Sequence, residues 1–501
     1  MAFLFELSES VNPFQGLIVL SVTILILSLF AVSKNKVIKK CLTALVLFST
    51  AAAFLLNIHS YALCGNFSGF LIFFGSVQML EIGIIIFSAV NVLFFITMNR
   101  KTEGNFVKEL ILFVFMLICA EFIVISSNFL LMFTSLSIFI LTVFQLVSTL
   151  NSSSGEMVTH ILRFILRPTL TVIFFFSGFS MLYGAQDFKN FSQVLESGDL
   201  SNPFISISLI LFGIALFLYF FLFPLQGPYI KMIKRGSSAS NAVIWFLYFP
   251  VGFFLFLKLG SLYSYFIEEN NIYYSAILAV AALGFMLAGN IGAVSTKSLR
   301  RMKSFLFLFF ISAFLFNISM YSAGIINKGS MGLFNFLNIL IILFSFMPLY
   351  GIFSSIEEDK GKDSLVSIRG LGRNNIYAGI NIVIIFLSWS GLIYYLKPFM
   401  NFFNGGNFLD MGVIGIALLI FFLICFVFLA INVLRILICI YKKASGGADG
   451  EKQEKILFPK FLYVYITFFS IVIIVTPVVY LLGRMGIDIA FIDFCISEFS
   501  F

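Results

Sequence analysis

The sequence predicts an all-α membrane protein with about fourteen transmembrane helices. Hydrophobic residues make up 60% of its 501 residues and charged residues only 11%, and the mean hydropathy is +1.07. Soluble globular proteins carry about 25% charged residues, so this chain has too few polar side chains to cover a surface in water. A bilayer core of about 30 Å needs roughly 20 apolar residues per helix. Apolar windows of that length lie near 14–33, 41–60, 77–98, 107–127, 129–150, 160–183, 203–226, 240–262, 272–295, 303–325, 333–355, 374–404, 410–440 and 458–483.

The basic residues indicate how the chain is oriented. If the spans alternate in direction, 26 of the 31 Lys and Arg residues fall on one side. Basic loops stay on the inner side of a membrane, so both termini are expected on the outer side. The same distribution accounts for the net charge of +8 without a nucleic-acid partner, because the basic residues form no single patch. The longest polar stretches are only linker-sized, so no soluble domain is predicted.

Two of the predicted spans contain proline in the middle of the membrane. The seventh span contains FPLQGP at Phe223–Pro228, and the twelfth contains YYLKPF at Tyr394–Phe399. Proline removes a backbone donor and clashes with the preceding turn, and in lipid the freed carbonyls must be satisfied by protein or water. Helix breaks are therefore expected at Pro224, Pro228 and Pro398.

The positions of the two breaks suggest an internal repeat. Helices four to eight and nine to thirteen form two groups of five, and the break lies in the fourth member of each. Five is odd, so the second group is inverted relative to the first, which is typical of ion or solute translocation. Ordinary proline kinks in a helix bundle are the alternative. The predicted divisions are three N-terminal helices in 1–106, the two five-helix repeats in 107–268 and 269–441, and a loop with a last helix in 442–501.

Few ionisable side chains fall inside the predicted spans, where such a group is a candidate for function. Glu121 is either a functional carboxylate of the fourth span or a protonated packing residue. Lys397 adjoins the second break and is a candidate proton or water site. Glu81 is expected at a solvated helix end. Lys258 is a further candidate for a proton path, although extension of its side chain to the outer headgroups is favoured.

Three stretches resemble a known family. GNIGAVSTKSLRRMKSF at Gly289–Phe305 resembles a motif of the N-type (subunit 2) antiporter-like subunit of respiratory complex I. RGLGRNN at Arg369–Asn375 is similar to the basic turn before that family's broken twelfth helix, and SSNFLLMFTSLS at Ser126–Ser137 to the start of its fifth helix. Pro224 falls at the family's first helix break. The order and spacing of these motifs agree with the family over nearly the whole chain.

The resemblance implies a two-fold inverted repeat with a proton path through the membrane. It implies a non-redox subunit of a proton-translocating NADH:ubiquinone oxidoreductase, with no catalytic centre, cofactor or metal in this chain. Flavin and iron–sulfur clusters would lie on partner subunits, and quinone would bind elsewhere. The expected partners are neighbouring antiporter-like subunits of the membrane arm and lipids such as cardiolipin. The six scattered cysteines, which form no CxxC pair, likewise predict neither a metal site nor a disulfide framework.

The chain departs from the family where the proton path requires titratable groups. Under this alignment the family's glutamate on helix five falls on Ser137 and its lysine on helix seven falls on Tyr219. The lysine of helix eight falls near Pro250, and the position on helix twelve falls near Asn401, one turn from Lys397. Serine and asparagine hold water but store no proton near neutral pH. The sequence therefore predicts a weakened or lost proton path and a scaffolding role.

Location and alternatives follow from the remaining features. The 69 phenylalanines and an N-terminus that matches no presequence favour a mitochondrially encoded inner-membrane protein with both termini in the intermembrane space. A bacterial plasma membrane is the alternative. A subunit of a multi-subunit sodium/proton antiporter, a purely structural subunit and a stand-alone secondary transporter are the rival functions. The transporter would form a polar pocket from Gln226, Tyr219 and Asn401.

Overall fold

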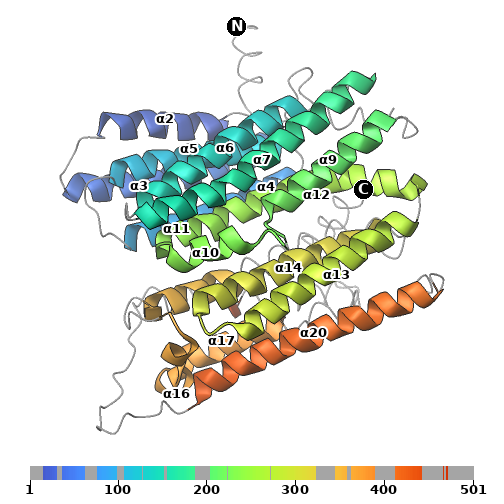
Figure 1. The fold of residues 1–501 in the computed structure, drawn as a ribbon. Coiled ribbons are helices and arrows are strands. Elements are labelled where there is room, and N and C mark those ends of the chain that lie inside the picture. The colour runs from blue at the N-terminus through green and yellow to red at the C-terminus, as the bar shows by residue number, and fades with distance from the viewer. Residues whose placement is uncertain are drawn as a thin grey trace, which may run out of the picture. The chain divides into compact units, whose positions relative to one another are not determined.

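The structure is a computed structural model, and it divides the chain into two compact units. The first unit is Met1–Phe266 and the second is Ile267–Phe501. All the elements in the described part of the chain are helices (Figure 1). The residues that the structure describes are 15–30, 36–61, 76–98, 106–126, 128–151, 155–186, 203–222, 224–270, 272–322, 345–357, 363–389, 412–442, 467 and 470–471.

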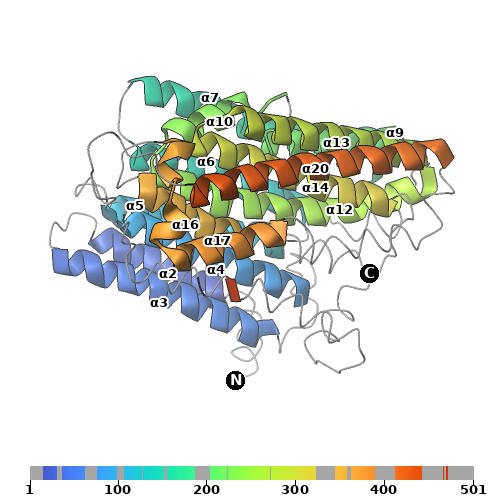
Figure 2. The ribbon, with the colours of Figure 1, turned by 90° about the horizontal axis from the view of Figure 1, so that it is seen from below.

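The first unit is a bundle of long apolar helices. Its elements are α2 (Gln15–Leu29), α3 (Lys36–Tyr61), α4 (Ser76–Met98), α5 (Phe106–Ile125), α6 (Phe129–Leu150), α7 (Gly155–Gln186), α9 (Pro203–Tyr219), α10 (Gly227–Arg235), α11 (Ser238–Val243), the π-helix η2 (Ile244–Tyr248) and α12 (Phe249–Asn270). Helices α2 and α3 lie side by side, and α5 contacts α2, α4 and α6 (Figures 1 and 2). Helix α7 packs between α6 and α9. The short α11 and the π-helix both contact α4.

Aromatic side chains fill the space between α6, α7 and α9. The rings of Phe133 and Phe175 stack with centroids 4.8 Å apart, and Phe212 contacts both. Phe129 stacks on Phe212 from the first residue of α6. All four side chains are fully buried. Buried aromatic pairs of this kind add to the stability that burial alone gives, so this layer stabilises the packing of α9 on α6 and α7.

The second unit is built around a close helix pair. Its elements are α13 (Ile272–Ser295), α14 (Leu299–Ser322), a helix over 345–357, the 3₁₀-helix η3 (Leu365–Ile368), α16 (Leu371–Asn374), α17 (Ile376–Trp389) and α20 (Gly412–Tyr441). Helix α13 contacts both α14 and α20. Gly289 allows the first contact, because a Cβ there would lie 2.9 Å from the carbonyl oxygen of Phe305 and 3.0 Å from the backbone nitrogen of Phe309.

The described helices suit a lipid environment. Five are long and apolar enough to cross a membrane by length and composition: Phe129–Leu150, Glu156–Gly184, Ser238–Leu259, Leu278–Ser295 and Ile416–Tyr441. Shorter apolar helices include Gln15–Leu29 and Pro203–Tyr219. The chain is therefore a membrane protein, and its described part is all-helical. The count of fourteen spans, the inverted repeats and the predicted domain boundaries stay predictions, as several of the predicted spans lie partly or wholly outside the described residues.

Candidate functional site: the break after α9 and two buried charge clusters

The segment between α9 and α10 is a helix break with defined hydrogen bonds. The amide of Phe221 donates to Leu218 O and the amide of Leu222 donates to Phe217 O. This pair of bonds is the Schellman pattern for ending a helix, in which the residue at the position of Phe221 is usually glycine in the left-handed conformation. Phe221 has φ 51°. A bulky residue in this conformation costs roughly 1–2 kcal/mol, so the surrounding packing must hold it there.

Aromatic stacking and an arginine stabilise the break. The Phe221 ring is fully buried and stacks on Phe164 at 4.9 Å and on Tyr229 at 5.7 Å. Arg167 on α7 donates from its guanidinium to the carbonyl oxygen of Leu225, within the turn that contains Pro224. A freed carbonyl in a membrane interior needs a donor of this kind.

Tyr219, the last residue of α9, forms a reciprocal pair with Tyr248, the last residue of the π-helix. The hydroxyl of Tyr219 donates to Tyr248 O at 2.7 Å, and the hydroxyl of Tyr248 donates to Tyr219 O at 3.0 Å. The two rings stack with centroids 4.3 Å apart and planes 6° apart. Their exposed fractions are 0% and 1%. Each phenol thus satisfies a carbonyl of the other residue, and the helix break is closed by an aromatic pair.

The helix after the π-helix accommodates this pair. Pro250 lies in the first turn of α12 and has no amide hydrogen, so a regular α-helical bond to Phe246 O cannot form there. The π-helix, with its wider i to i−5 bonds, ends at this point, and the amide of Phe249 donates to Ile244 O. Gly252 leaves room for the tyrosine ring, since a Cβ on it would lie 2.2 Å from Tyr219 Cε1.

The described positions that the alignment assigns to the proton path carry no acid or amine. The hydroxyl of Ser137 donates to Phe133 O at 2.7 Å, one turn back in α6. The hydroxyl of Tyr219 donates to Tyr248 O, and the polar pocket with Gln226 and Asn401 stays a prediction. Lys397, Pro398 and Asn401 lie outside the described residues.

A buried acid and a lysine lie elsewhere in the first unit. Lys258 on α12 donates from Nζ to Ile123 O at 2.9 Å and to Ser126 O at 2.8 Å, at the C-terminal end of α5. Glu81 lies on α4 of the same unit. Glu81 is only 2% exposed and Glu121 on α5 only 1%.

One expectation about these residues differs from the structure. Glu81 is buried rather than at a solvated helix end, because the second turn of α4 is covered within the bundle. The ammonium of Lys258 is held by two carbonyls at the end of α5, and its extension to the outer headgroups stays a prediction. Carbonyls in the last turn of a helix have no intrahelical partner and carry partial negative charge. The role of either residue in a proton path stays a prediction.

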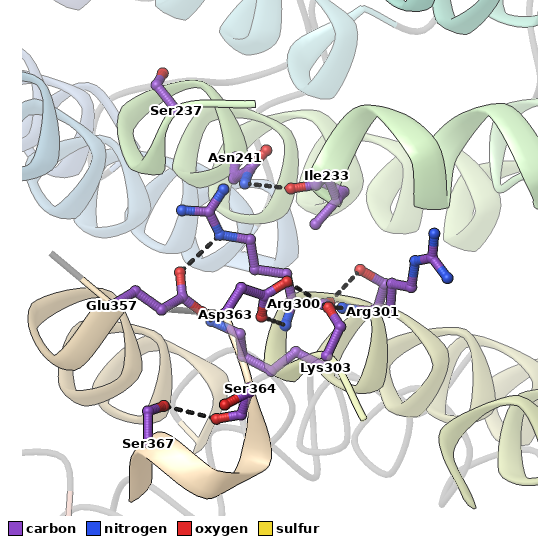
Figure 3. A network of polar contacts seen from close by, with 12 residues as sticks. Ile233, Ser237, Asn241, Arg300, Arg301, Lys303, Glu357, Asp363, Ser364 and Ser367 are labelled. Carbon is purple, nitrogen blue, oxygen red and sulfur yellow. Dashed lines mark hydrogen bonds and ion pairs between the residues drawn. The ribbon is translucent and has the colours of Figure 1, made fainter. Parts of the chain in front are cut away.

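A second charge cluster lies at the start of α14 in the second unit (Figure 3). Arg300 Nε lies 2.7 Å from Glu357 Oε2, and Lys303 Nζ lies 3.7 Å from Glu357 Oε1. Asp363 accepts from the Arg300 amide at 3.0 Å and from the Ser298 hydroxyl. Ser298 in turn caps the helix by accepting from the Arg301 amide at 3.3 Å. The cluster contains two basic and two acidic side chains, so it is balanced in charge.

Lys303 is the deeply buried cation of this cluster. Its side chain is 2% exposed, and its ammonium lies 4.8 Å from the ring centre of Tyr350 and 5.5 Å from that of Phe353. Aromatic faces stabilise a cation at this distance. No local sequence signal predicts this network, because Glu357 lies 54 residues from Lys303 along the chain.

The Gly289–Phe305 stretch also ties α13 to α20. The Asn290 amide donates to Cys425 O at 2.8 Å, and the Asn432 amide donates to Asn290 O at 3.2 Å. Arg435 donates to Thr296 O at 2.9 Å and to Val294 O, which satisfies carbonyls at the end of α13. These residues therefore hold α13 and α20 together. Within the described ranges no group of three or more His, Cys, Asp or Glu residues is arranged to hold a metal ion.

Comparisons with known proteins agree with this fold. No family model matches the chain. NADH-quinone oxidoreductase subunit N 2 from Acidobacterium capsulatum is 23% identical over 300 residues, which are 58% of this chain and 58% of that protein. The matched region is thus less than two thirds of the relative's length.

Three solved structures share the architecture. A chain of respiratory complex I from Thermus thermophilus matches with a TM-score of 0.71 and 16% identity, over 94% of this chain and 98% of that chain. A chain of the membrane-bound sulfane sulfur reductase, an archaeal respiratory membrane complex, gives 0.73 and 16%, over 98% of both chains. A chain of the Mrp complex from Dietzia sp. DQ12-45-1b gives 0.76 and 12%, over 98% of this chain and 96% of that chain.

The fold of this chain is therefore the fold of these membrane-complex chains. The sequence match then narrows the resemblance to subunit N of NADH-quinone oxidoreductase. The resemblance to a divergent antiporter-like subunit of complex I, stated above from the Gly289–Phe305 motif and its companions, is confirmed.

Proposed function

We propose that this chain is a subunit 2-type membrane-arm subunit of a proton-translocating NADH:quinone oxidoreductase whose own proton path is weakened or lost. The Tyr219–Tyr248 pair is the observation that supports a weakened or lost proton path. A path at the helix break needs a group that changes charge near neutral pH, and the side chain there is a buried phenol engaged by a carbonyl. A phenol has an ordinary pKa near 10, so it does not exchange a proton readily at neutral pH.

The chain would then act as a scaffold between neighbouring antiporter-like subunits. In this proposal the redox cofactors lie on partner subunits and quinone binds elsewhere in the complex. Lipids such as cardiolipin are further partners of this chain. We place the chain in the mitochondrial inner membrane with both termini in the intermembrane space, and the bacterial plasma membrane is the alternative. Protease accessibility of tags at each terminus in sealed membranes tests the orientation: tags cleaved only from the inner side would contradict it.

Purification of the tagged chain in mild detergent tests the assignment to a complex. We expect flavin-bearing and iron–sulfur-bearing subunits to co-purify, with NADH:quinone reductase activity in the same fraction. A chain that purifies alone would indicate a stand-alone transporter. Co-purification with antiporter subunits only, together with sodium-dependent proton flux, would indicate an Mrp-type antiporter. Either result would contradict the assignment.

The proton-to-electron ratio of the reconstituted complex tests the weakened path. We expect a ratio below the full value of the family and no change in it when Tyr219 is replaced by phenylalanine, since the hydroxyl only satisfies a carbonyl. Ser137→Ala serves as a second variant, because this hydroxyl is bound to its own helix. A full ratio, or a ratio that falls in Tyr219→Phe while quinone reduction continues, would show that protons pass through the break.

A further inference from the structure

The face of α7 against which α10 packs carries basic side chains. The two helices lie side by side (Figure 2), and two polar contacts define how they pair. Arg167 donates to Leu225 O, just before α10 begins, and Arg235 Nη1 at the end of α10 lies 2.5 Å from Glu156 Oε2. The later residue of α7 meets the earlier residue of the second segment, so the two segments run antiparallel.

The antiparallel pairing brings together the residues between these two contacts. Arg163 is seven residues after Glu156 and four before Arg167, so the three side chains share one face of α7. On α10, Lys231 is one turn before Arg235 and lies on the same face. Arg163 and Lys231 therefore border the same seam between the two helices.

This basic seam has more positive charge than its own acids can balance. Residues 155–167 and 225–235 contain five Lys and Arg residues and one acid, and that acid is already bound to Arg235. Arg163 and Lys231 are both exposed. Among the described residues, none forms a hydrogen bond or ion pair with either side chain. The seam thus presents two cations whose charge is uncompensated.

Helix α7 is longer than a bilayer core is thick. It has 32 residues and is about 48 Å long, whereas the hydrocarbon core is about 30 Å thick. All of its Arg, Lys, Asp and Glu side chains lie within residues 155–167. Charged side chains are costly in hydrocarbon, so this end of α7 lies at the headgroups.

An exposed apolar stripe begins beside the basic seam. Leu162 adjoins Arg163, and Leu162, Leu166 and Ile173 are spaced by four and seven residues, so they share a face of α7. Their exposed fractions are 52%, 61% and 55%. The stripe continues from the charged end of α7 toward the rest of the helix. Cations at headgroup level that adjoin an apolar stripe offer contacts to both parts of a phospholipid.

We propose that the seam between α7 and α10 binds the headgroup of an anionic phospholipid. Arg163 and Lys231 donate charge-assisted hydrogen bonds to its phosphate oxygens, and an acyl chain lies along Leu166 and Ile173. Basic pockets between membrane helices on the inner side take up such headgroups, and a zwitterionic headgroup would bring a second cation against the two basic side chains. The inference deepens the proposed function, on which it rests for lipid as a partner, by naming the lipid class and the residues that bind it.

Native mass spectrometry of the full-length chain, purified in detergent with any subunits that accompany it, tests the proposal. The chain is stripped of lipid and titrated with dioleoyl phosphatidylglycerol or dioleoyl phosphatidylcholine. We expect the anionic lipid to bind the wild type more tightly. Arg163→Gln combined with Lys231→Gln should weaken this binding roughly 30-fold, because each basic residue contributes about 1 kcal/mol of attraction. Equal binding of the two lipids would show that only the apolar stripe is recognised and would overturn the proposal.

A control with the same loss of charge separates a defined site from diffuse attraction. Lys40→Gln combined with Lys442→Gln removes two exposed basic side chains elsewhere, so it should leave the affinity unchanged. An equal loss in both double variants would mean that only net charge matters and would contradict the site. Inorganic phosphate should not displace the lipid at millimolar concentration, since it has no acyl chain; displacement would indicate a site for free phosphate instead.

A variant that strengthens binding keeps the test decisive if the double variant folds poorly. Glu156→Gln releases Arg235 from its ion pair, so the affinity for phosphatidylglycerol should rise roughly fivefold, the effect of about one added basic residue. An unchanged affinity would overturn the assignment of the headgroup to this seam.

A photo-crosslinking amino acid in place of Leu166 tests the occupant of the stripe in intact membranes. We expect a lipid adduct, whereas a protein adduct would show that a partner subunit covers this face and would contradict the lipid site. Redox subunits play no part in these measurements. A chain that purifies without them and still binds the anionic lipid would refute the proposed function and leave this inference standing.

Discussion

Replacing Gly252 by alanine tests whether the aromatic pair at the helix break is rigid. The new Cβ would lie 2.2 Å from Tyr219 Cε1 and 2.7 Å from Cδ1. Carbon atoms in ordinary contact are about 3.5–4.0 Å apart, so the tyrosine ring would have to move by about 1 Å or more. The ring is not the free end of a flexible side chain, because its hydroxyl is bound to Tyr248 O.

The expected cost follows from the interactions that this movement breaks. Each of the two reciprocal hydrogen bonds contributes about 0.5–1.5 kcal/mol, and the stacked pair contributes a further 0.5–1.5 kcal/mol or so. Alanine is a better helix former than glycine by about 1 kcal/mol, which offsets part of the loss. We therefore expect Gly252→Ala to destabilise the protein by about 1–3 kcal/mol, as overpacked cores do.

The assay is detergent-induced unfolding of the purified chain, followed by circular dichroism and by the fluorescence of Trp245 in the π-helix. Gly184→Ala is the matched control, because a Cβ at this position on α7 meets nothing within 4 Å. Its unfolding free energy should stay level or rise. Tyr219→Leu introduced into the Gly252→Ala protein should make the alanine harmless, since the ring that it meets is gone. Equal stability of Gly252→Ala and Gly184→Ala would refute the rigid pair.

Three further changes have defined outcomes. Gly289→Ala places its Cβ 2.9 Å from a backbone oxygen of α14, so it should lower the thermal midpoint of unfolding strongly. The control Gly284→Ala lies on the same helix, but its Cβ meets nothing within 4 Å, so the midpoint should stay unchanged. Equal midpoints for the two variants would contradict the close approach of α13 and α14. Asp363→Ala removes the acceptor at the start of α14 and should cost about 0.5–2 kcal/mol of unfolding free energy, as the loss of a helix cap does; an unchanged unfolding curve would be inconsistent with that role. Lys258→Met leaves Ile123 O and Ser126 O without their donor and should lower the unfolding free energy by about 1–3 kcal/mol; an unchanged unfolding curve would show that these hydrogen bonds do not contribute to stability.

The sequence predicted the class of this protein because class depends on composition and on runs of residues. Apolar windows identify spans without knowledge of their neighbours. Pro224 lies in the segment between α9 and α10, and Pro228 lies in the first turn of α10. The motif at Gly289–Phe305 carried the family resemblance, and its glycine and asparagine have contacts that explain why those residue types occur there. Local chemistry of this kind is readable from the sequence alone.

The contacts that define the candidate sites were not readable, because each joins residues far apart in the chain. Tyr219 and Tyr248 are 29 residues apart, and nothing near Tyr248 indicates that a π-helix will present its carbonyl. The two carbonyls that hold the Lys258 ammonium lie more than 130 residues earlier in the chain, at the end of α5. The position of a residue within an apolar window says only how far it lies along its own helix. The contacts of Tyr219 and Lys258 depend instead on which other helix end packs beside that residue.

The aromatic break also explains how the departures at the aligned positions are compatible with a stable fold. A lysine at the end of α9 would need carboxylate or water partners in a buried place, and its uncompensated charge would be costly. The hydroxyl of Tyr219 needs only one hydrogen-bond acceptor, which is the carbonyl at the end of the π-helix. Gly252 leaves space for the tyrosine ring. Tyr248 satisfies the orphan carbonyl that the helix end creates. Under the predicted alignment, a phenol in place of an amine at this break therefore requires a matched set of neighbours, and Tyr248 and Gly252 are such neighbours.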